Sequence, residues 1–118
     1  GPDIGLFERP MIRGTTKLQE PFTDESIYHC AIHEMGHGID DLMRLSLNAE
    51  FLLKHKDDIA AMNEEARSEN TYYLKPMEAC SEITGALIGD NVNDSQSKAV
   101  MQAFPRSTQW LRAKLGIW

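Results

Sequence analysis

The sequence predicts a single, mostly α-helical domain of the α+β class, with a small β element at its start. Its 118 residues suffice for one ordinary domain but not for two. Hydrophobic residues make up 42% and charged residues 25%, which is a globular composition. Beyond Pro21, apolar residues recur at helical spacing in segments bounded by capping residues, glycine and proline. Gly1 and Pro2 resemble the remnant of a removed tag, so residues 3–118 are taken as the domain.

The predicted β element lies within residues 3–22. This stretch mixes apolar and polar residues and contains Pro10, Gly14 and Pro21, which oppose a helix. A short strand around Leu6–Ile12 is therefore expected there.

A long helix is predicted next, over residues 26 to about 45. Thr23 is a suitable N-cap, and Asp24 and Glu25 complement the positive end of the helix dipole. No proline interrupts the run, and its apolar residues follow helical spacing: Ile27, Cys30, Ala31, Met35, Ile39 and Leu42.

A second helix is predicted to begin at Asn48, whose side chain can cap it, and to carry Phe51. Its continuation starts at Asp57 or Asp58 and runs through Ala66 to a polar stretch. The apolar residues of this continuation again recur at helical spacing, so we expect helix over most of the segment.

Three further helices complete the prediction. Pro76 occupies a first-turn position, and the helix that follows extends to Ile88, before a glycine. A polar loop then leads to a helix over residues 98–104. Pro105 ends that helix, and Ser107 is placed to cap a last short one.

The charge balance excludes several classes of partner. Twelve basic and 18 acidic residues give a net charge of -6. Nucleic-acid-binding and anionic-membrane-binding surfaces carry a basic excess, so neither partner is predicted. No apolar run approaches the ~20 residues that span a bilayer, and the start lacks the pattern of a signal peptide. Two cysteines, Cys30 and Cys80, are too few for a disulfide framework and are interpreted as small buried residues.

The chemically informative segment is His33-Glu34-Met35-Gly36-His37, an HExxH motif inside the long helix. Residues four apart lie one turn above each other, so both imidazoles can hold one Zn²⁺. Glu34, beside the first histidine, can act as general base toward a water molecule that the metal activates. The motif therefore predicts a zinc hydrolase site.

Catalytic zinc takes three protein ligands, and Glu78 is the leading candidate for the third. Glu82 lies one turn later and can orient a ligand by a hydrogen bond. A pair of glutamates four apart also fits an exposed helix face. The apolar neighbours of these two favour a buried helix instead, where a carboxylate needs a partner.

Residues 33–41, with Gly38, Ile39, Asp40 and Asp41 after the motif, resemble the anthrax lethal factor catalytic domain family, which includes the Pro-Pro endopeptidases. The tyrosines and the ExxxE pair in residues 72–82 are also similar to that family. The resemblance spans about residues 22–90.

The resemblance implies a compact zincin-like metalloprotease fold with a long active-site helix and a second ligand-bearing helix. It also implies that His33, His37 and Glu78 bind zinc and that Glu34 is the general base. A tyrosine would donate a hydrogen bond to the oxyanion, and Tyr72 is preferred for this role. Tyr73 remains open, because the family's tyrosine position is occupied here by Thr71.

Two further side-chain groups have alternative interpretations. Asp40 or Asp41 could accept a hydrogen bond from a ligand histidine, or either could pair with Arg44 at the surface. His29 extends the histidine stripe, but about 12 Å of helix rise separates it from His37, so the three cannot share one ion. We interpret His29 as a histidine satisfied by other groups.

The function expected from these patterns is a zinc endopeptidase that binds one Zn²⁺ and acts on a protein or peptide substrate. The resemblance points to the catalytic part of a bacterial toxin or effector, secreted or delivered into a target cell, with an inhibitor or immunity protein as a further partner. Two alternatives stay open. One is a compact peptidase of another Glu-zincin family, and the other is a non-catalytic, zinc-stabilised binding module.

Overall fold

The computed structural model describes residues 24–118, so the strand expected around Leu6–Ile12 and the cap expected at Thr23 lie outside it. Within the described range the chain forms helices and no strand, which confirms the mostly α prediction. The elements in order are α1 (Asp24–Met43), η1 (Leu45–Leu47), α2 (Ala49–Ala60), α3 (Glu64–Glu69), η2 (Thr71–Leu74), α4 (Pro76–Ile88), α5 (Ser95–Ala103) and α6 (Pro105–Leu115). No helix among these residues is long and apolar enough to cross a bilayer.

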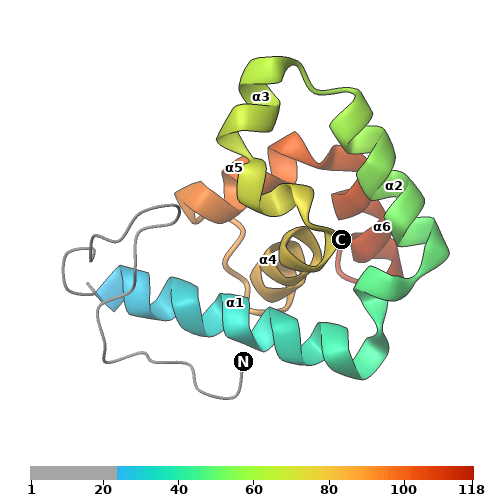
Figure 1. Ribbon diagram of the computed structural model, residues 1–118. Helices are drawn as coiled ribbons and strands as arrows, with labels where there is room; N and C mark the ends of the chain where they lie inside the picture. The colour runs from blue at the N-terminus through green and yellow to red at the C-terminus, as the bar shows by residue number, and fades with distance from the viewer. Residues whose placement is uncertain (1–23) are drawn as a thin grey trace.

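Helix α4 is the centre of the fold, and the other helices surround it (Figure 1). Every residue of α4 from Ala79 to Leu87 is buried, as expected for a helix that packs on all its faces. The core around it is drawn from most of the described elements: Leu45, Phe51, Tyr73, Ala79, Cys80, Ile83, Leu87, Val100, Phe104 and Leu111.

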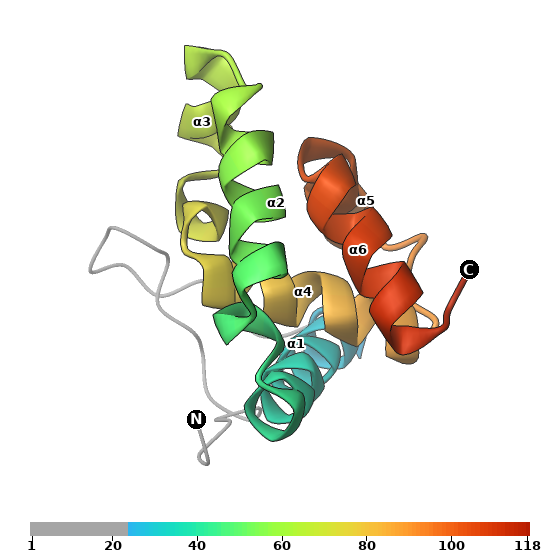
Figure 2. The same cartoon turned by 90° about the vertical axis from the view of Figure 1, so that its right-hand side faces the viewer.

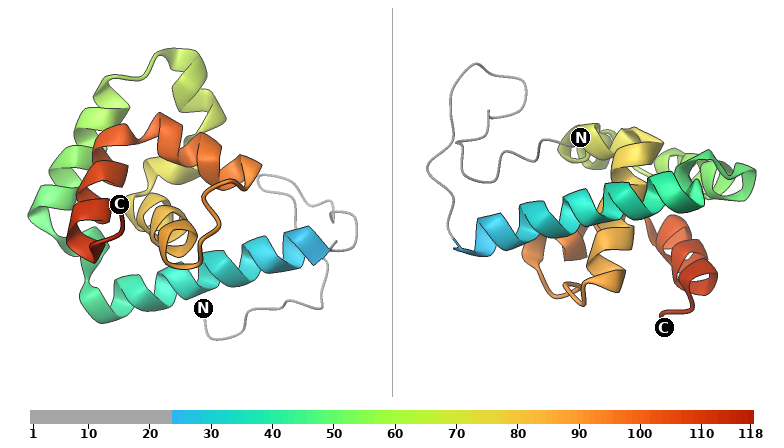
Figure 3. Two further views of the ribbon diagram at one scale, coloured as in Figure 1. Left: turned by 180° about the vertical axis from the view of Figure 1, so that it is seen from behind. Right: turned by 90° about the horizontal axis from the view of Figure 1, so that it is seen from below.

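Helices α1 and α4 cross at a steep angle. Figure 1 shows α1 lengthwise and α4 end-on, and Figure 2 shows the reverse. Figure 3 shows the same crossing from behind and from below, with α1 running along one side of the molecule. The crossing sets the middle of α1, which carries the HExxH motif, directly against α4.

Two glycines allow the backbones of α1 and α4 to touch. A Cβ atom at Gly36 would collide with the backbone carbonyl oxygen of Ser81, and one at Gly85 would collide with that of Ile32. Only residues without side chains permit such an approach. Gly38, one residue beyond the motif, has open space around it, so packing requires glycine at position 36 but not at position 38.

Several predicted helix boundaries are confirmed. Asn48 caps α2, because its side-chain oxygen accepts a hydrogen bond from the backbone N–H of Glu50. Pro76 occupies the first turn of α4, and Gly89 follows its last residue. The continuous helix expected through Ala66 is instead two helices, since Asn63 caps a new helix, α3, by accepting from the N–H of Ala66.

The predicted role of Ser107 is corrected by the structure. Helix α6 begins at Pro105, and Ser107 lies inside its first turn. Asp58, on α2, caps this helix from a distance: its carboxylate accepts from the backbone N–H of Arg106 at 3.1 Å and that of Ser107 at 2.8 Å. Sequence spacing could not reveal a cap supplied from 48 residues away.

The close contact between α1 and α4 predicts different effects for substitutions of Gly36 and Gly38. Gly36→Ala should lower the free energy of unfolding by about 1–3 kcal/mol or more, because two backbones must separate. Gly38→Ala, the matched control, should leave stability unchanged or raise it by up to ~1 kcal/mol, because alanine favours helix. Urea unfolding of both variants measures this, and equal stability of the two would contradict the packing account.

Candidate metal centre

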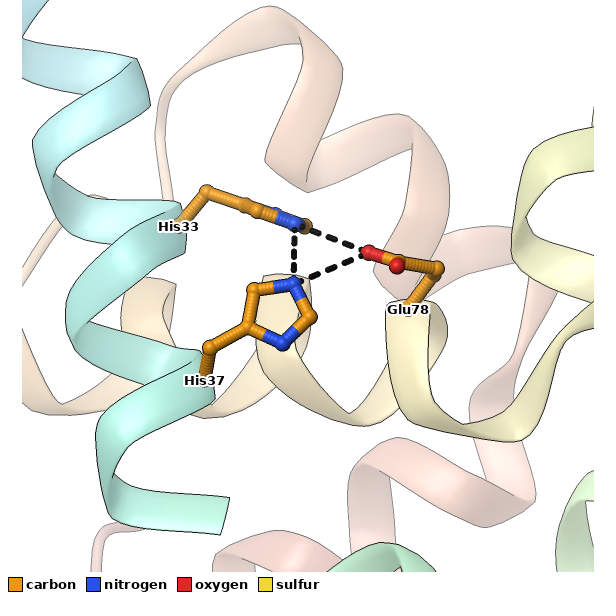
Figure 4. A group of neighbouring side chains, drawn as sticks. All are labelled: His33, His37 and Glu78. Atoms are coloured by element: carbon orange, nitrogen blue, oxygen red, sulfur yellow. Dashed lines mark hydrogen bonds and ion pairs between the residues drawn. The ribbon is translucent and has the colours of Figure 1, made fainter. Parts of the chain in front are cut away.

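The two histidines of the HExxH motif and Glu78 converge between α1 and α4 (Figure 4). Nε2 of His37 lies 3.1 Å from Nε2 of His33. Oε1 of Glu78 lies 3.1 Å from Nε2 of His33 and 3.0 Å from Nε2 of His37. One ligand atom from each side chain thus forms a nearly equilateral triangle, and this group can hold a metal ion.

The size of the triangle fits a tetrahedral zinc site. Zinc ligands at roughly 2.0–2.2 Å from the metal lie about 3.3–3.5 Å from one another, so the three atoms need to separate by only a few tenths of an ångström. The side chains of His33, His37 and Glu78 are 14%, 21% and 17% exposed. Solvent can therefore reach the cluster, as a site that admits a further ligand requires.

The chemistry of the three atoms also suits a cation. When the rings are neutral, each imidazole can turn a nitrogen lone pair, and the carboxylate an oxygen lone pair, toward one ion between them. The donor set of two imidazoles and one carboxylate is one that zinc commonly takes.

The far nitrogen of each ring is held by a residue of α4. Nδ1 of His33 lies 2.8 Å from Oε1 of Glu82, and Nδ1 of His37 lies 3.0 Å from Oγ of Ser81. An ionised carboxylate only accepts hydrogen bonds, so Nδ1 of His33 donates to Glu82. In the neutral ring this leaves the Nε2 lone pair free to face a metal.

Glu82 lies where the sequence analysis placed it, whereas Ser81 was missed. Glu78, Ser81 and Glu82 follow the i, i+3, i+4 spacing of one helix face, which was the available signal. Serine is too common on helices for that spacing to have singled it out.

The electrostatics of the cluster favour ionised carboxylates. Burial acts to raise the pKa of Glu82, but hydrogen bonds from His29, His33 and Ser97 outweigh it and lower that pKa to about 2. Burial likewise opposes the ionisation of Glu78, while hydrogen bonds from Tyr72 and His33 bring its pKa below the ordinary value. For His33, burial lowers the pKa, yet contacts with Glu82 and Glu78 raise it overall. A metal would therefore compete with a proton for Nε2 of His33.

The expectation that Asp40 or Asp41 orients a ligand histidine is corrected. Asp40 is buried, and its carboxylate accepts hydrogen bonds from the N–H and Oγ of Ser46, both at 2.6 Å. It thereby secures the turn after α1. Asp41 lies exposed on α1, and Ser81 occupies the position beside His37 that an aspartate was expected to fill.

The structure separates the two tyrosines. The ring centroid of Tyr72 lies 6.4 Å from that of His33, so Tyr72 borders the cluster. Tyr73 is buried, and its hydroxyl accepts a hydrogen bond from Nε2 of Gln96 at 2.7 Å. Glu34 is half-buried on α1, between the two histidines in sequence.

Comparisons of the chain with protein-family models, with curated proteins and with solved structures gave no significant match. The resemblance to the lethal factor family therefore rests on the motif and spacing of residues 33–41 and 72–82. The geometry of the cluster stands independently of that resemblance.

The third ligand is tested by Glu78→Gln, which keeps the shape of the side chain but removes its charge. Its zinc affinity, measured by chelator competition, should fall by more than the 10–100-fold that loss of an orienting partner costs. Glu69→Gln, at the exposed end of α3, is the matched control and should bind as the wild type does. Wild-type affinity in the Glu78 variant would remove this residue from the site.

Proposed function

We propose that the protein is a zinc-dependent endopeptidase. The observation that carries this proposal is the convergence of both HExxH histidines on Glu78, with their far nitrogens held by Glu82 and Ser81. A solvent-reachable cluster of two imidazoles and a carboxylate is the ligand set of Glu-zincin peptidases, and Glu34 is the base that the motif provides.

His33, His37 and Glu78 would hold the zinc ion. Bound there, zinc supplies a Lewis acid that polarises the scissile carbonyl and lowers the pKa of a water molecule. Glu34 takes the proton from the attacking water and later gives it to the leaving amine. Tyr72, which borders the cluster, donates a hydrogen bond to the oxyanion that develops on the carbonyl oxygen. Glu82 and Ser81 keep the two imidazoles oriented.

The biological setting that the resemblance suggests is a secreted bacterial toxin or effector, delivered into a target cell and acting on a protein or peptide. An inhibitor or immunity protein would then be a further partner. A compact Glu-zincin peptidase of another family, with no toxin role, uses the same side chains and remains the alternative within the enzyme class.

A non-catalytic, zinc-stabilised module is the alternative outside the enzyme class. Structural zinc sites are closed by four protein ligands, whereas residues 24–118 bring together three, each partly exposed. A structural site also has no use for a carboxylate between the two histidines. Both observations favour the enzyme.

Glu34→Gln tests the proposal. The zinc-loaded wild type should cut members of a peptide library, and the variant should cut them ~10²–10⁴-fold more slowly, because it lacks the general base. Zinc content by elemental mass spectrometry should stay at about one per chain in both. Glu25→Gln, an exposed acid on the first turn of α1, is the matched control.

Two outcomes would contradict the proposal. Equal cleavage by the Glu34 variant would mean that the activity comes from another group or from a contaminating protease. A zinc-loaded wild type that leaves the whole library uncut would favour the binding module.

A further inference from the structure

His29 contacts two carboxylates that come from distant parts of the chain. Its Nδ1 lies 2.9 Å from Oδ2 of Asp94, the residue that caps α5. Its Nε2 lies 3.2 Å from Oε1 of Glu82, and that same oxygen lies 2.8 Å from Nδ1 of His33. The four side chains form a continuous series, Asp94–His29–Glu82–His33, which ends at a candidate metal ligand.

The contacts of His29 determine its protonation. Carboxylates only accept hydrogen bonds, so a ring nitrogen that faces one is stabilised by carrying a proton. A neutral imidazole has a single N–H and can satisfy only one of the two carboxylates. With Asp94 on one side and Glu82 on the other, the favoured form of His29 is the doubly protonated imidazolium.

Glu82 requires a positive charge nearby, because its side chain is only 2% exposed and an uncompensated buried carboxylate is costly. Its other oxygen accepts a hydrogen bond from the hydroxyl of Ser97, which is neutral. His33 must be neutral to bind a metal. Of the two histidines that pair with Glu82, only His29 can then supply the charge.

The electrostatics agree with this assignment. The contact with Glu82 raises the pKa of His29, and although burial opposes it, the charges of Glu82 and Asp94 keep that pKa above its ordinary value. These two carboxylates reach the ring from α4 and from the residue that precedes α5.

We propose that His29 is a positioning residue of the metal centre, whose imidazolium, held between Asp94 and Glu82, fixes Glu82 against Nδ1 of His33. Glu82 then keeps the proton of His33 on Nδ1 and the lone pair of Nε2 toward the metal. Through Asp94, the start of α5 also takes part in supporting the site. The inference rests on the proposed zinc site. It adds His29, which contacts Glu82, to the residues that orient the ligand His33.

Zinc affinity of His29→Gln, measured by chelator competition, is the first test. The neutral amide cannot supply the charge, so affinity should fall 10–100-fold, as for other orienting partners. Tyr28→Phe is the matched control, because the Tyr28 hydroxyl joins the same turn of α1 to the carbonyl of Gly89 without touching Glu82. Its affinity should stay within about twofold of wild type. Wild-type affinity in the His29 variant would overturn the proposal.

Nitrogen-15 NMR of the imidazole rings in the metal-free wild type is the second test, and it needs neither zinc nor activity. At pH 7 both ring nitrogens of His29 should be protonated, a signature that a merely space-filling residue would not give. A single protonated nitrogen on His29 would overturn the proposal. Absence of zinc binding in the wild type, by contrast, would sink the proposed function, so the two failures are distinguishable.

Discussion

The candidate site depends on the backbone contact between α1 and α4. With Gly36 and Gly85 at the crossing, the helices approach closely enough for one turn of α4 to meet two turns of α1. That turn carries Glu78, Ser81 and Glu82, which contact His33 and His37. Side chains at either glycine position would force the helices apart and move each of these contacts. The glycine within the HExxH motif is therefore a packing residue, while His33 and His37 are candidate metal ligands.

Three buried carboxylates, Asp40, Asp58 and Glu82, have different kinds of partner. Asp40 is satisfied by the backbone and hydroxyl of Ser46. Asp58 is satisfied by Ser107 and Arg106. Both hold helix ends, at the turn after α1 and the start of α6. Glu82 instead pairs with two histidines, which makes its surroundings sensitive to protonation and to metal binding. The partners, rather than the burial, distinguish Glu82 in the candidate site from Asp40 and Asp58.

Much of the fold follows from local signals in the sequence. Asn48, Pro76 and Gly89 mark helix ends through the chemistry of their own backbone and side chains, so their roles were predictable. The cap that Asp58 supplies to α6 and the division between α2 and α3 were not. The cap depends on a contact between residues that are far apart in the sequence. The division depends on whether the side chain of Asn63 caps a new helix or the preceding helix continues.

The same distinction applies to the site. The spacing of His33 and His37, and of Glu78 and Glu82, reflects helix periodicity and could be recognised in the sequence. Ser81 contacts the site because α4 packs against α1, and Asp94 because the residue before α5 reaches His29, and neither residue type signals such a contact in the sequence. Asp40 was misassigned because its contact with Ser46 depends on the path of the turn after α1.

The central claim is that the α1–α4 crossing holds a zinc site made by His33, His37 and Glu78. Anomalous diffraction from crystals of the zinc-loaded protein, recorded on both sides of the zinc absorption edge, tests it most directly. We expect one strong peak within ~2.2 Å of the Nε2 atoms of His33 and His37 and of a Glu78 oxygen. A peak elsewhere in the molecule, or none between these three side chains in fully loaded protein, would contradict it.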